Sequence, residues 1–166
     1  RFTDGVSDLY MILRMTARSQ DSERQTFVFP RKTHTYDVRA AKYLGFTDAV
    51  TVAVPLSGVS LFAQLPVKPE EISIDGGTEI VRRGTDFVFG LTIKPGNPEP
   101  GVFVFHVKLF KPDGSSSFLF ERNLHAPNGK TDCVFRIAHD DPVGIWKLEV
   151  TEPLTRIAET KTFIVK

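Results

Sequence analysis

Two pairs of adjacent carboxylates are the residues of this chain best suited to acid–base chemistry. They are Glu70-Glu71 and Asp140-Asp141. Glycoside hydrolysis needs two carboxyl groups that face each other across a cleft about 5–9.5 Å wide. Neighbours on a strand point to opposite faces, however, and neighbours in a turn usually face solvent. We therefore expect neither pair to be catalytic, and we predict that the chain is not itself an enzyme.

A metal site is the second possibility, because His139 precedes the Asp140-Asp141 pair. These side chains offer nitrogen and oxygen ligands, but a calcium ion takes about six to eight oxygens and the rest of such a cage is not evident. A turn capped by an aspartate is the preferred interpretation. The four histidines are scattered without ligand spacing. We predict neither a metal nor a cofactor.

Candidate nucleophiles have equally plain structural interpretations. Cys133 alternates with Phe135 and Ile137, a pattern that favours a buried, inert thiol. As the only cysteine, it excludes an internal disulfide. Residues 115–117 are three serines without a G-x-S-x-G frame, which favours a solvated hairpin over a catalytic serine.

Exposed aromatic residues are the stronger functional candidates. Carbohydrate-binding modules stack sugar rings on aromatic faces, and large apolar groups left in solvent require an explanation. Alternation places five aromatic side chains on outer strand faces: Tyr36, Tyr43, Phe46, Phe110 and Phe118. Sugar binding and packing between domains are both open for them, and packing is the preferred interpretation.

Composition indicates an ordinary globular protein made of strands. Of the 166 residues, 41% are hydrophobic and 25% charged, and fourteen Phe beside two Met favour pleated strands over helices. A net charge of +1 leaves no electrostatic surplus to drive binding to nucleic acid or to an anionic membrane. No apolar run approaches about 18 residues, so we predict no membrane span.

Two prolines in Pro66-Val67-Lys68-Pro69 mark the expected domain boundary, which divides the chain into residues 1–68 and 69–166. In the first part, residues 8–17 are expected to form a strand with Leu9, Met11, Leu13 and Met15 on one face, and a helix is the alternative for this segment. The strand is expected to pair as a hairpin with residues 25–29, which end at Pro30. The start at Arg1, without Met, suggests a piece of a longer polypeptide.

The second part has about seven short strands separated by Gly and Pro clusters, the pattern of an immunoglobulin-like β-sandwich. Residues 102–122 form its clearest hairpin, with a turn at Lys111-Pro112-Asp113-Gly114. Trp146 alternates with Leu148 and Val150, and we predict that it anchors the core opposite the face of Phe103, Phe105 and Val107. Fold class is therefore all-β, with two tandem β-sandwich domains.

Two resemblances add context. The pattern D-x-P-x-G-x-W-x-L-x-V over residues 140–150 resembles macroglobulin-type and related bacterial immunoglobulin-like domains, and covers most of residues 70–166. Residues 34–38, 43–45 and 59–66 are similar to the closing β-sandwich domain of large bacterial β-galactosidase-like glycoside hydrolases. In that family the catalytic carboxylates belong to a barrel upstream, so no active-site residue carries over to this chain.

These resemblances imply a non-catalytic accessory module of a larger, extracellular or periplasmic carbohydrate-active protein from a bacterium. Its expected partners are upstream domains of the same polypeptide and a polysaccharide. Two alternatives stay open at this point. One is an autonomous carbohydrate-binding module, and the other is an immunoglobulin-like spacer or adhesin domain at the cell surface.

Overall fold

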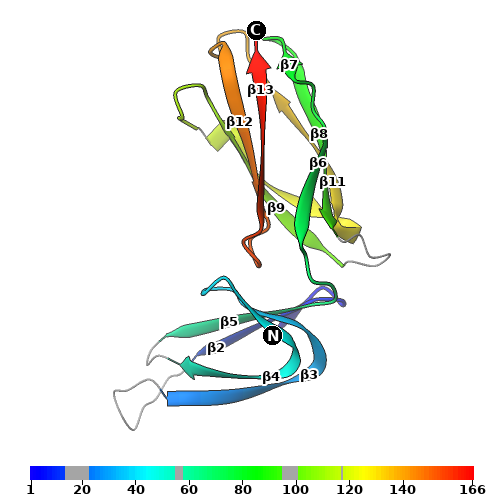
Figure 1. Cartoon of the computed structure of the whole chain (residues 1–166), viewed down its shortest axis with the longest axis vertical. Helices are drawn as coiled ribbons and strands as arrows, with labels where there is room; N and C mark the ends of the chain where they lie inside the picture. Colours follow the sequence, from blue (N-terminus) through cyan, green and yellow to red (C-terminus); the bar gives the residue numbers. More distant parts are fainter. Residues whose placement is uncertain (14–22, 55–57, 95–100, 117) are drawn as a thin grey trace. The chain divides into compact units, whose positions relative to one another are not determined.

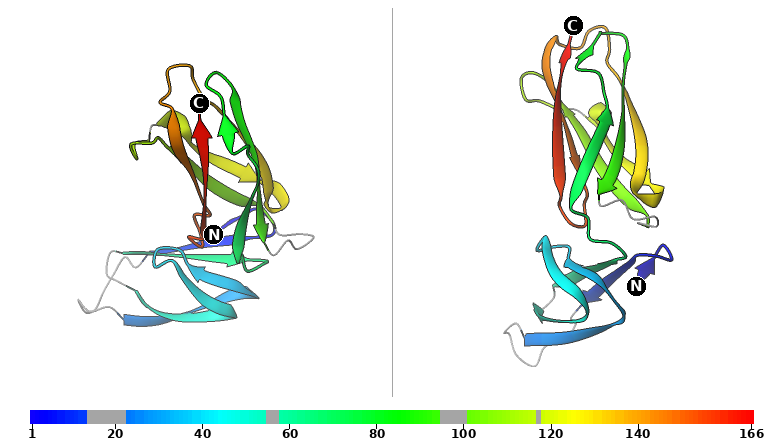
Figure 2. Two further views of the ribbon diagram at one scale, coloured as in Figure 1. Left: turned by 45° about the horizontal axis from the view of Figure 1, so that its top comes forward. Right: turned by 45° about the vertical axis from the view of Figure 1, so that its right-hand side comes forward.

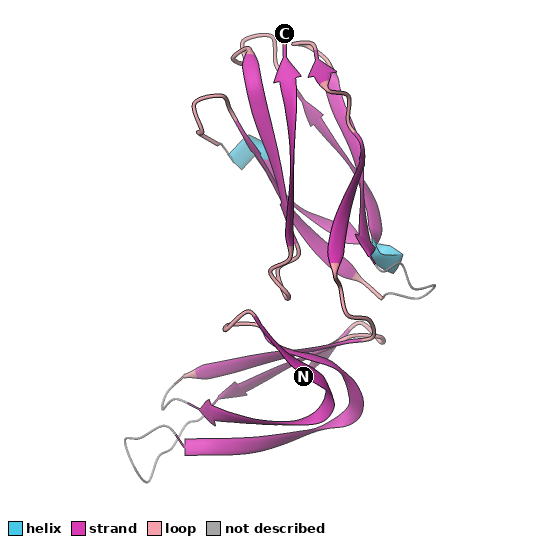
Figure 3. Ribbon diagram, in the orientation of Figure 1, coloured by secondary structure: helices cyan, strands magenta, loops and turns pink. Residues whose placement is uncertain are grey.

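The structure is a computed structural model that describes residues 1–13, 23–54, 58–94, 101–116 and 118–166. The chain divides into two compact units, Arg1–Lys68 (unit 1) and Pro69–Lys166 (unit 2). The division falls among the prolines of residues 66–69. Each unit has its own strands and its own core, and nearly all of the regular structure is strand (Figures 1 and 3).

Unit 1 contains one antiparallel sheet. Its described strands are hydrogen-bonded in the order β1-β2-β5-β3-β4. They are β1 (Phe2–Thr3), β2 (Asp8–Leu13), β3 (Glu23–Asp37), β4 (Lys42–Val54) and β5 (Val59–Leu65). The expected hairpin between the first two long strands is wrong, because β2 pairs with β5 and β5 pairs in turn with β3.

A bend in β3 shapes this unit. The strand continues through Pro30, where the sequence predicted its end, and runs on to Asp37. Its register with β4 shifts between Val28 and Thr33, so the proline lies where the ladder is interrupted and its missing N–H costs little. The start of β3 and the end of β4 therefore curve over one face of β2 and β5 (Figure 2).

The core of unit 1 lies inside this bend. Phe29, Val50 and Phe62 are buried together, and partly buried Tyr10 and Ile12 of β2 pack against them. Phe27, Leu44 and Val52 complete the cluster. The inner face of β2 is thus the one with Tyr10 and Ile12. On the other face Met11 and Leu13 are exposed, and Met15 lies outside the described residues.

Unit 2 is an immunoglobulin-like sandwich of two described sheets, which confirms the all-β prediction. The sheets have the orders β10-β9-β12-β13-β7 and β11-β8-β6. The strands are β6 (Glu71–Gly76), β7 (Ile80–Val81), β8 (Asp86–Lys94), β9 (Phe103–Phe110), β10 (Glu121–Ala126), β11 (Lys130–Arg136), β12 (Gly144–Thr151) and β13 (Ala158–Val165).

The predicted hairpin is right in its first arm and its turn, and wrong in its second arm. Lys111 accepts a backbone hydrogen bond from Gly114 at 2.9 Å, and Gly114 has a φ of 79°. The chain then forms a 3₁₀ helix at Phe118–Phe120 before β10 begins at Glu121. Phe120, the last residue of this helix, is buried and packs against Trp146.

Trp146 is fully buried in unit 2, as its spacing predicted. Its indole N–H donates to the carbonyl of Pro142 at 2.9 Å, and its ring meets Phe120 edge-on at 5.2 Å. The prediction that it faces the strand of Phe103 across the core is wrong. β9 is the hydrogen-bonded neighbour of β12 within one sheet, so their inward side chains share a face.

Candidate functional site

Four aromatic side chains gather on one face of the β3–β4 ribbon in unit 1. His34 pairs with Phe46, and Tyr36 pairs with Tyr43. The ring centroids are 5.0 Å apart in each pair. His34 Nδ1 and Tyr43 Oη form a hydrogen bond of 2.9 Å that joins the two pairs. We call these four residues the aromatic patch.

A β-bulge brings Tyr43 and Phe46 to the same face. In a regular strand, residues three apart point to opposite sides. Here Thr35 pairs with Gly45 while Tyr36 pairs with Tyr43, so Leu44 is the extra residue on β4. Gly45 has a φ of 118°, a conformation that glycine adopts readily. Leu44 consequently contributes to the core, and the two rings face outward.

Exposure separates the members of the aromatic patch. The Phe46 side chain is 54% exposed and Tyr43 is 37% exposed, whereas Tyr36 is 4% exposed. The prediction that Tyr36 offers an outer ring is therefore wrong, and its ring is the buried member of the patch. His34 is partly buried between them. Sequence reasoning did not select His34, because only its cross-strand position next to Phe46 makes it part of a cluster.

Two lysines flank the exposed rings. Lys32 Nζ lies 5.7 Å from the centroid of Phe46, and Lys68 Nζ lies 5.2 Å from that of Tyr43. Both lysines are exposed. Burial lowers the pKa of His34, and the positive charge of Lys68 lowers it further. The patch therefore combines a neutral imidazole with two ammonium groups at its rim.

The other two predicted aromatic residues belong to unit 2, Phe110 to β9 and Phe118 to the 3₁₀ helix. Phe110 is partly buried at the end of β9, with Lys147 Nζ 4.2 Å from its centroid and Lys108 Nζ at 5.5 Å. Phe118 is 83% exposed in the 3₁₀ helix. Two lysine ammonium groups thus lie over the ring of Phe110, and Phe118 is the more exposed of the two rings.

The paired carboxylates do not face each other. Asp141 is buried, accepts a hydrogen bond from the backbone N–H of Ala138 at 2.8 Å and lies 3.3 Å from Lys111 Nζ, whereas Asp140 is exposed. Glu71 pairs with Lys94 at 3.3 Å, and its neighbour Glu70 is exposed. Among the described residues, no three His, Cys, Asp or Glu side chains cluster as metal ligands would.

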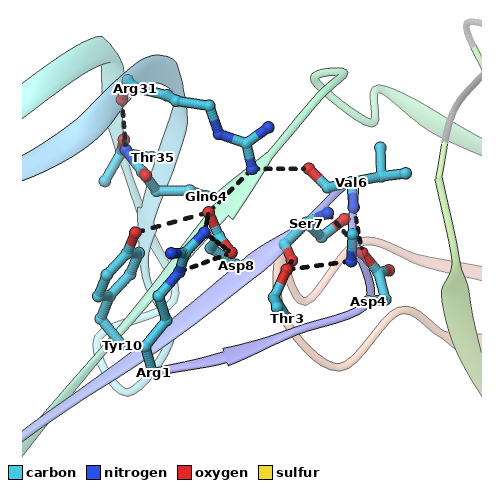
Figure 4. A network of polar contacts seen from close by, with 11 residues as sticks. Arg1, Thr3, Asp4, Val6, Ser7, Asp8, Tyr10, Arg31, Thr35 and Gln64 are labelled. Atoms are coloured by element: carbon cyan, nitrogen blue, oxygen red, sulfur yellow. Dashed lines mark hydrogen bonds and ion pairs between the residues drawn. The ribbon is translucent and has the colours of Figure 1, made fainter.

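A buried carboxylate, Asp8, anchors the polar network drawn in Figure 4. It is 1% exposed and accepts hydrogen bonds from Arg1 at 2.9 and 3.0 Å and from Arg31 at 2.9 Å. Burial alone would raise the pKa of Asp8, but the hydrogen bonds from Arg31, Thr3 and Arg1 hold it below its usual value. A carboxylate held ionised in this way is a poor proton donor, and through Arg31 it ties β2 to β3.

Gln64 extends this network to the bend of β3. Its side-chain amide donates to the carbonyl of Arg31 at 3.0 Å and to Thr35 Oγ1 at 3.3 Å (Figure 4). Arg31 is thus tied through its side chain to β2 and through its backbone to β5. Sequence reasoning missed this network, because its members come from separate strands and share no spacing.

Glu152 is the second deeply buried acid, in the loop between β12 and β13. Its carboxylate accepts hydrogen bonds from the backbone N–H groups of Leu154 and Thr155 and from the Thr155 hydroxyl. Burial raises the pKa of Glu152 despite these bonds. Cys133 is buried as predicted, and burial raises the pKa of its thiol.

Comparisons with known proteins give distant structural matches alone. No protein-family profile and no curated protein matches the sequence. A superoxide reductase (neelaredoxin) from Ignicoccus hospitalis is 10% identical, with a TM-score of 0.42, over 59% of this chain and 82% of its own. Salmonella alpha-2-macroglobulin is 12% identical, with a TM-score of 0.48, over 89% of this chain and 11% of its own.

A candidate beta-galactosidase from Bacteroides fragilis also matches, at 8% identity and a TM-score of 0.35. That match covers 95% of this chain and 32% of the other. Likenesses at this level do not assign a family. The class of the protein therefore rests on its own topology, which is that of a β-protein whose second unit is immunoglobulin-like. No helix in the described part of the chain is long and apolar enough to cross a membrane.

Proposed function

We propose that this chain is a non-catalytic accessory module of a larger, exported bacterial protein that acts on carbohydrate. The proposal that the chain is non-catalytic rests on the surroundings of its buried carboxylates. In the described residues, Asp8, Asp141 and Glu152 are the buried carboxylates. Each accepts hydrogen bonds from groups of its own unit. None is paired across an open cleft with a second carboxylate, as glycoside hydrolysis requires.

Carbohydrate binding is the second candidate function, and the aromatic patch favours it. Phe46 and Tyr43 present two partly exposed rings on a sheet surface, beside the polar His34. A sugar is apolar on the flat face of its ring and polar around its edge, which suits such a mixture. The same rings can instead pack against a neighbouring domain of the parent protein.

A panel of chromogenic glycosides tests the non-catalytic proposal directly. The purified chain should release no chromophore above the rate of a buffer blank. Turnover that disappears in Asp8→Asn, Asp141→Asn or Glu152→Gln, while the variant stays folded, would contradict the proposal. Turnover that survives all three substitutions calls for the same test at Glu70, Glu71 and Asp140, after a further purification step that removes contaminating enzymes.

A further inference from the structure

We propose that the aromatic patch binds an acidic saccharide, one that carries carboxylate or sulfate groups. This inference rests on the second candidate function above and makes its ligand class specific. Lys32 and Lys68 carry the argument, because they lie beside the two exposed rings.

The rings supply the apolar half of the site. Phe46 is half-exposed even with Lys32 beside it, and its apolar face costs free energy as long as water covers it. Tyr43 adds a second ring whose hydroxyl is fixed by the hydrogen bond to His34. The planes of His34 and Tyr43 differ by 33°, and those of His34 and Phe46 by 56°. This turned surface suits a saccharide chain whose successive rings rotate.

The ammonium groups supply the charged half. Each lies 5–6 Å from a ring centroid, at the long end of the cation–π range, and belongs to an exposed, flexible side chain. A sugar stacked on Phe46 or Tyr43 would bring a ring substituent within reach of the adjacent lysine. An acidic substituent would pair with it, whereas a neutral sugar would leave the charge unused. The lowered pKa of His34 keeps its imidazole neutral, so the charge of the site comes from the two lysines.

Two other ligand classes fit less well. A protein partner of ordinary affinity buries about 800 Å² on each side, which is more than two partly exposed rings provide. A nucleic acid would also offer stacking groups and negative charge. The chain as a whole carries a net charge of only +1, which provides little of the phosphate attraction that dominates such binding.

Binding is measured by isothermal titration calorimetry with the whole chain, at low and at high salt. The probes are polygalacturonate as the acidic polysaccharide, dextran as the neutral one and single-stranded DNA as the other polyanion. Polygalacturonate should bind more tightly than either. Phe46→Ala should weaken this binding at least about tenfold, and the double variant K32Q/K68Q by about tenfold, since each lysine contributes about threefold.

Matched control variants come from unit 2. Phe118→Ala removes an exposed ring and Lys130→Gln an exposed charge, and neither should change the affinity.

Asp48→Asn, two residues beyond Phe46 on β4, should strengthen polygalacturonate binding because it removes an exposed negative charge near the patch.

The outcomes separate this inference from the function on which it rests. Equal binding of dextran that depends on Phe46 but not on the lysines would keep carbohydrate binding and overturn the acidic ligand. Binding that depends on the lysines but not on Phe46 would be simple ion exchange and would overturn the inference. Tighter binding of DNA would overturn it in favour of the nucleic acid. If no probe binds, both the acidic ligand and carbohydrate binding by this patch are wrong.

Discussion

The two units place their aromatic rings in opposite ways. In unit 2 the rings fill the space between two sheets, where Phe87 of β8 stacks on Phe163 of β13 at a centroid distance of 4.0 Å. In unit 1 the core around Phe62 is enclosed by one bent sheet, and the rings of Phe46 and Tyr43 remain on its outer face. Most rings of unit 2 therefore contribute to its stability, with Phe118 as an exposed exception, whereas unit 1 keeps two neighbouring rings available for contact.

The buried carboxylates of the two units also have different partners. Asp8 of unit 1 links separate strands through Arg1 and Arg31, whereas Glu152 of unit 2 is held within its own loop. A domain of fewer than about 70 residues buries only about 60% of its surface on folding and is marginally stable. Unit 1 falls in this class, so its cross-strand ion pairs matter more to it than Glu152 matters to unit 2.

The largest expected effect comes from separating the units. Residues 69–166 expressed alone should give one cooperative thermal transition, because both sheets and the core of Trp146 lie within them. Residues 1–68 alone should unfold at a lower temperature or fail to give a sharp transition. Differential scanning calorimetry of both fragments measures this contrast. A molten or insoluble product from residues 69–166 would show that unit 2 depends on unit 1.

Trp146→Ala should have the next largest effect. Removing this fully buried side chain leaves a cavity and should lower the free energy of unfolding of unit 2 by about 3–5 kcal/mol. The neighbouring exposed residue offers a matched control, and Ile145→Ala should change it by less than about 0.5 kcal/mol. Chemical denaturation followed by circular dichroism provides both values.

Tyrosine signals make this comparison specific to one unit. All three tyrosines, Tyr10, Tyr36 and Tyr43, belong to unit 1, and the single tryptophan belongs to unit 2. The tyrosine transition should therefore stay where it is in Trp146→Ala. Equal shifts of both transitions would mean that the units unfold together, and the assignment of Trp146 to an independent core would then be wrong.

A smaller effect is expected from Asp8→Asn, which removes the charge that Arg1 and Arg31 share. The tyrosine transition should show a loss of about 1–3 kcal/mol in unit 1, the usual range for hydrogen bonds to a charged group. Asp48→Asn, an exposed aspartate on β4, is the control and should leave the transition nearly unchanged. An equal loss in both variants would argue against a special role for Asp8.

Lowering the pH should destabilise unit 1 through Asp8 and stabilise unit 2 through Glu152. The lowered pKa of Asp8 gives unit 1 stability that is present above about pH 4, the ordinary aspartate value, and is lost as the pH falls through the lower folded value. The raised pKa of Glu152 gives unit 2 a contribution that is complete below the ordinary glutamate value and is lost as the pH rises through the folded one. Asp8→Asn and Glu152→Gln should each flatten the corresponding profile.

The sequence alone predicted unit 2 in most of its parts. Along its strands buried apolar residues alternate with more exposed residues, some of them apolar such as Val88 and Ile145, because each strand lies between one core and solvent. Phe105 and Trp146 are therefore buried as predicted. The second arm of the hairpin escaped prediction, because strand alternation carries no signal for the 3₁₀ helix at Phe118–Phe120.

The fold of unit 1 depends on tertiary contacts to a far greater degree than the fold of unit 2. β3 continues through Pro30, where its end was predicted, and the pairing of β2 with β5 joins segments far apart in the chain. Neither is encoded by a local period. The candidate site depends on the same kind of information. The residue types at Tyr43 and Phe46 were visible in the sequence, but the bulge at Leu44 sets them on one face, and cross-strand register alone adds His34 and buries Tyr36.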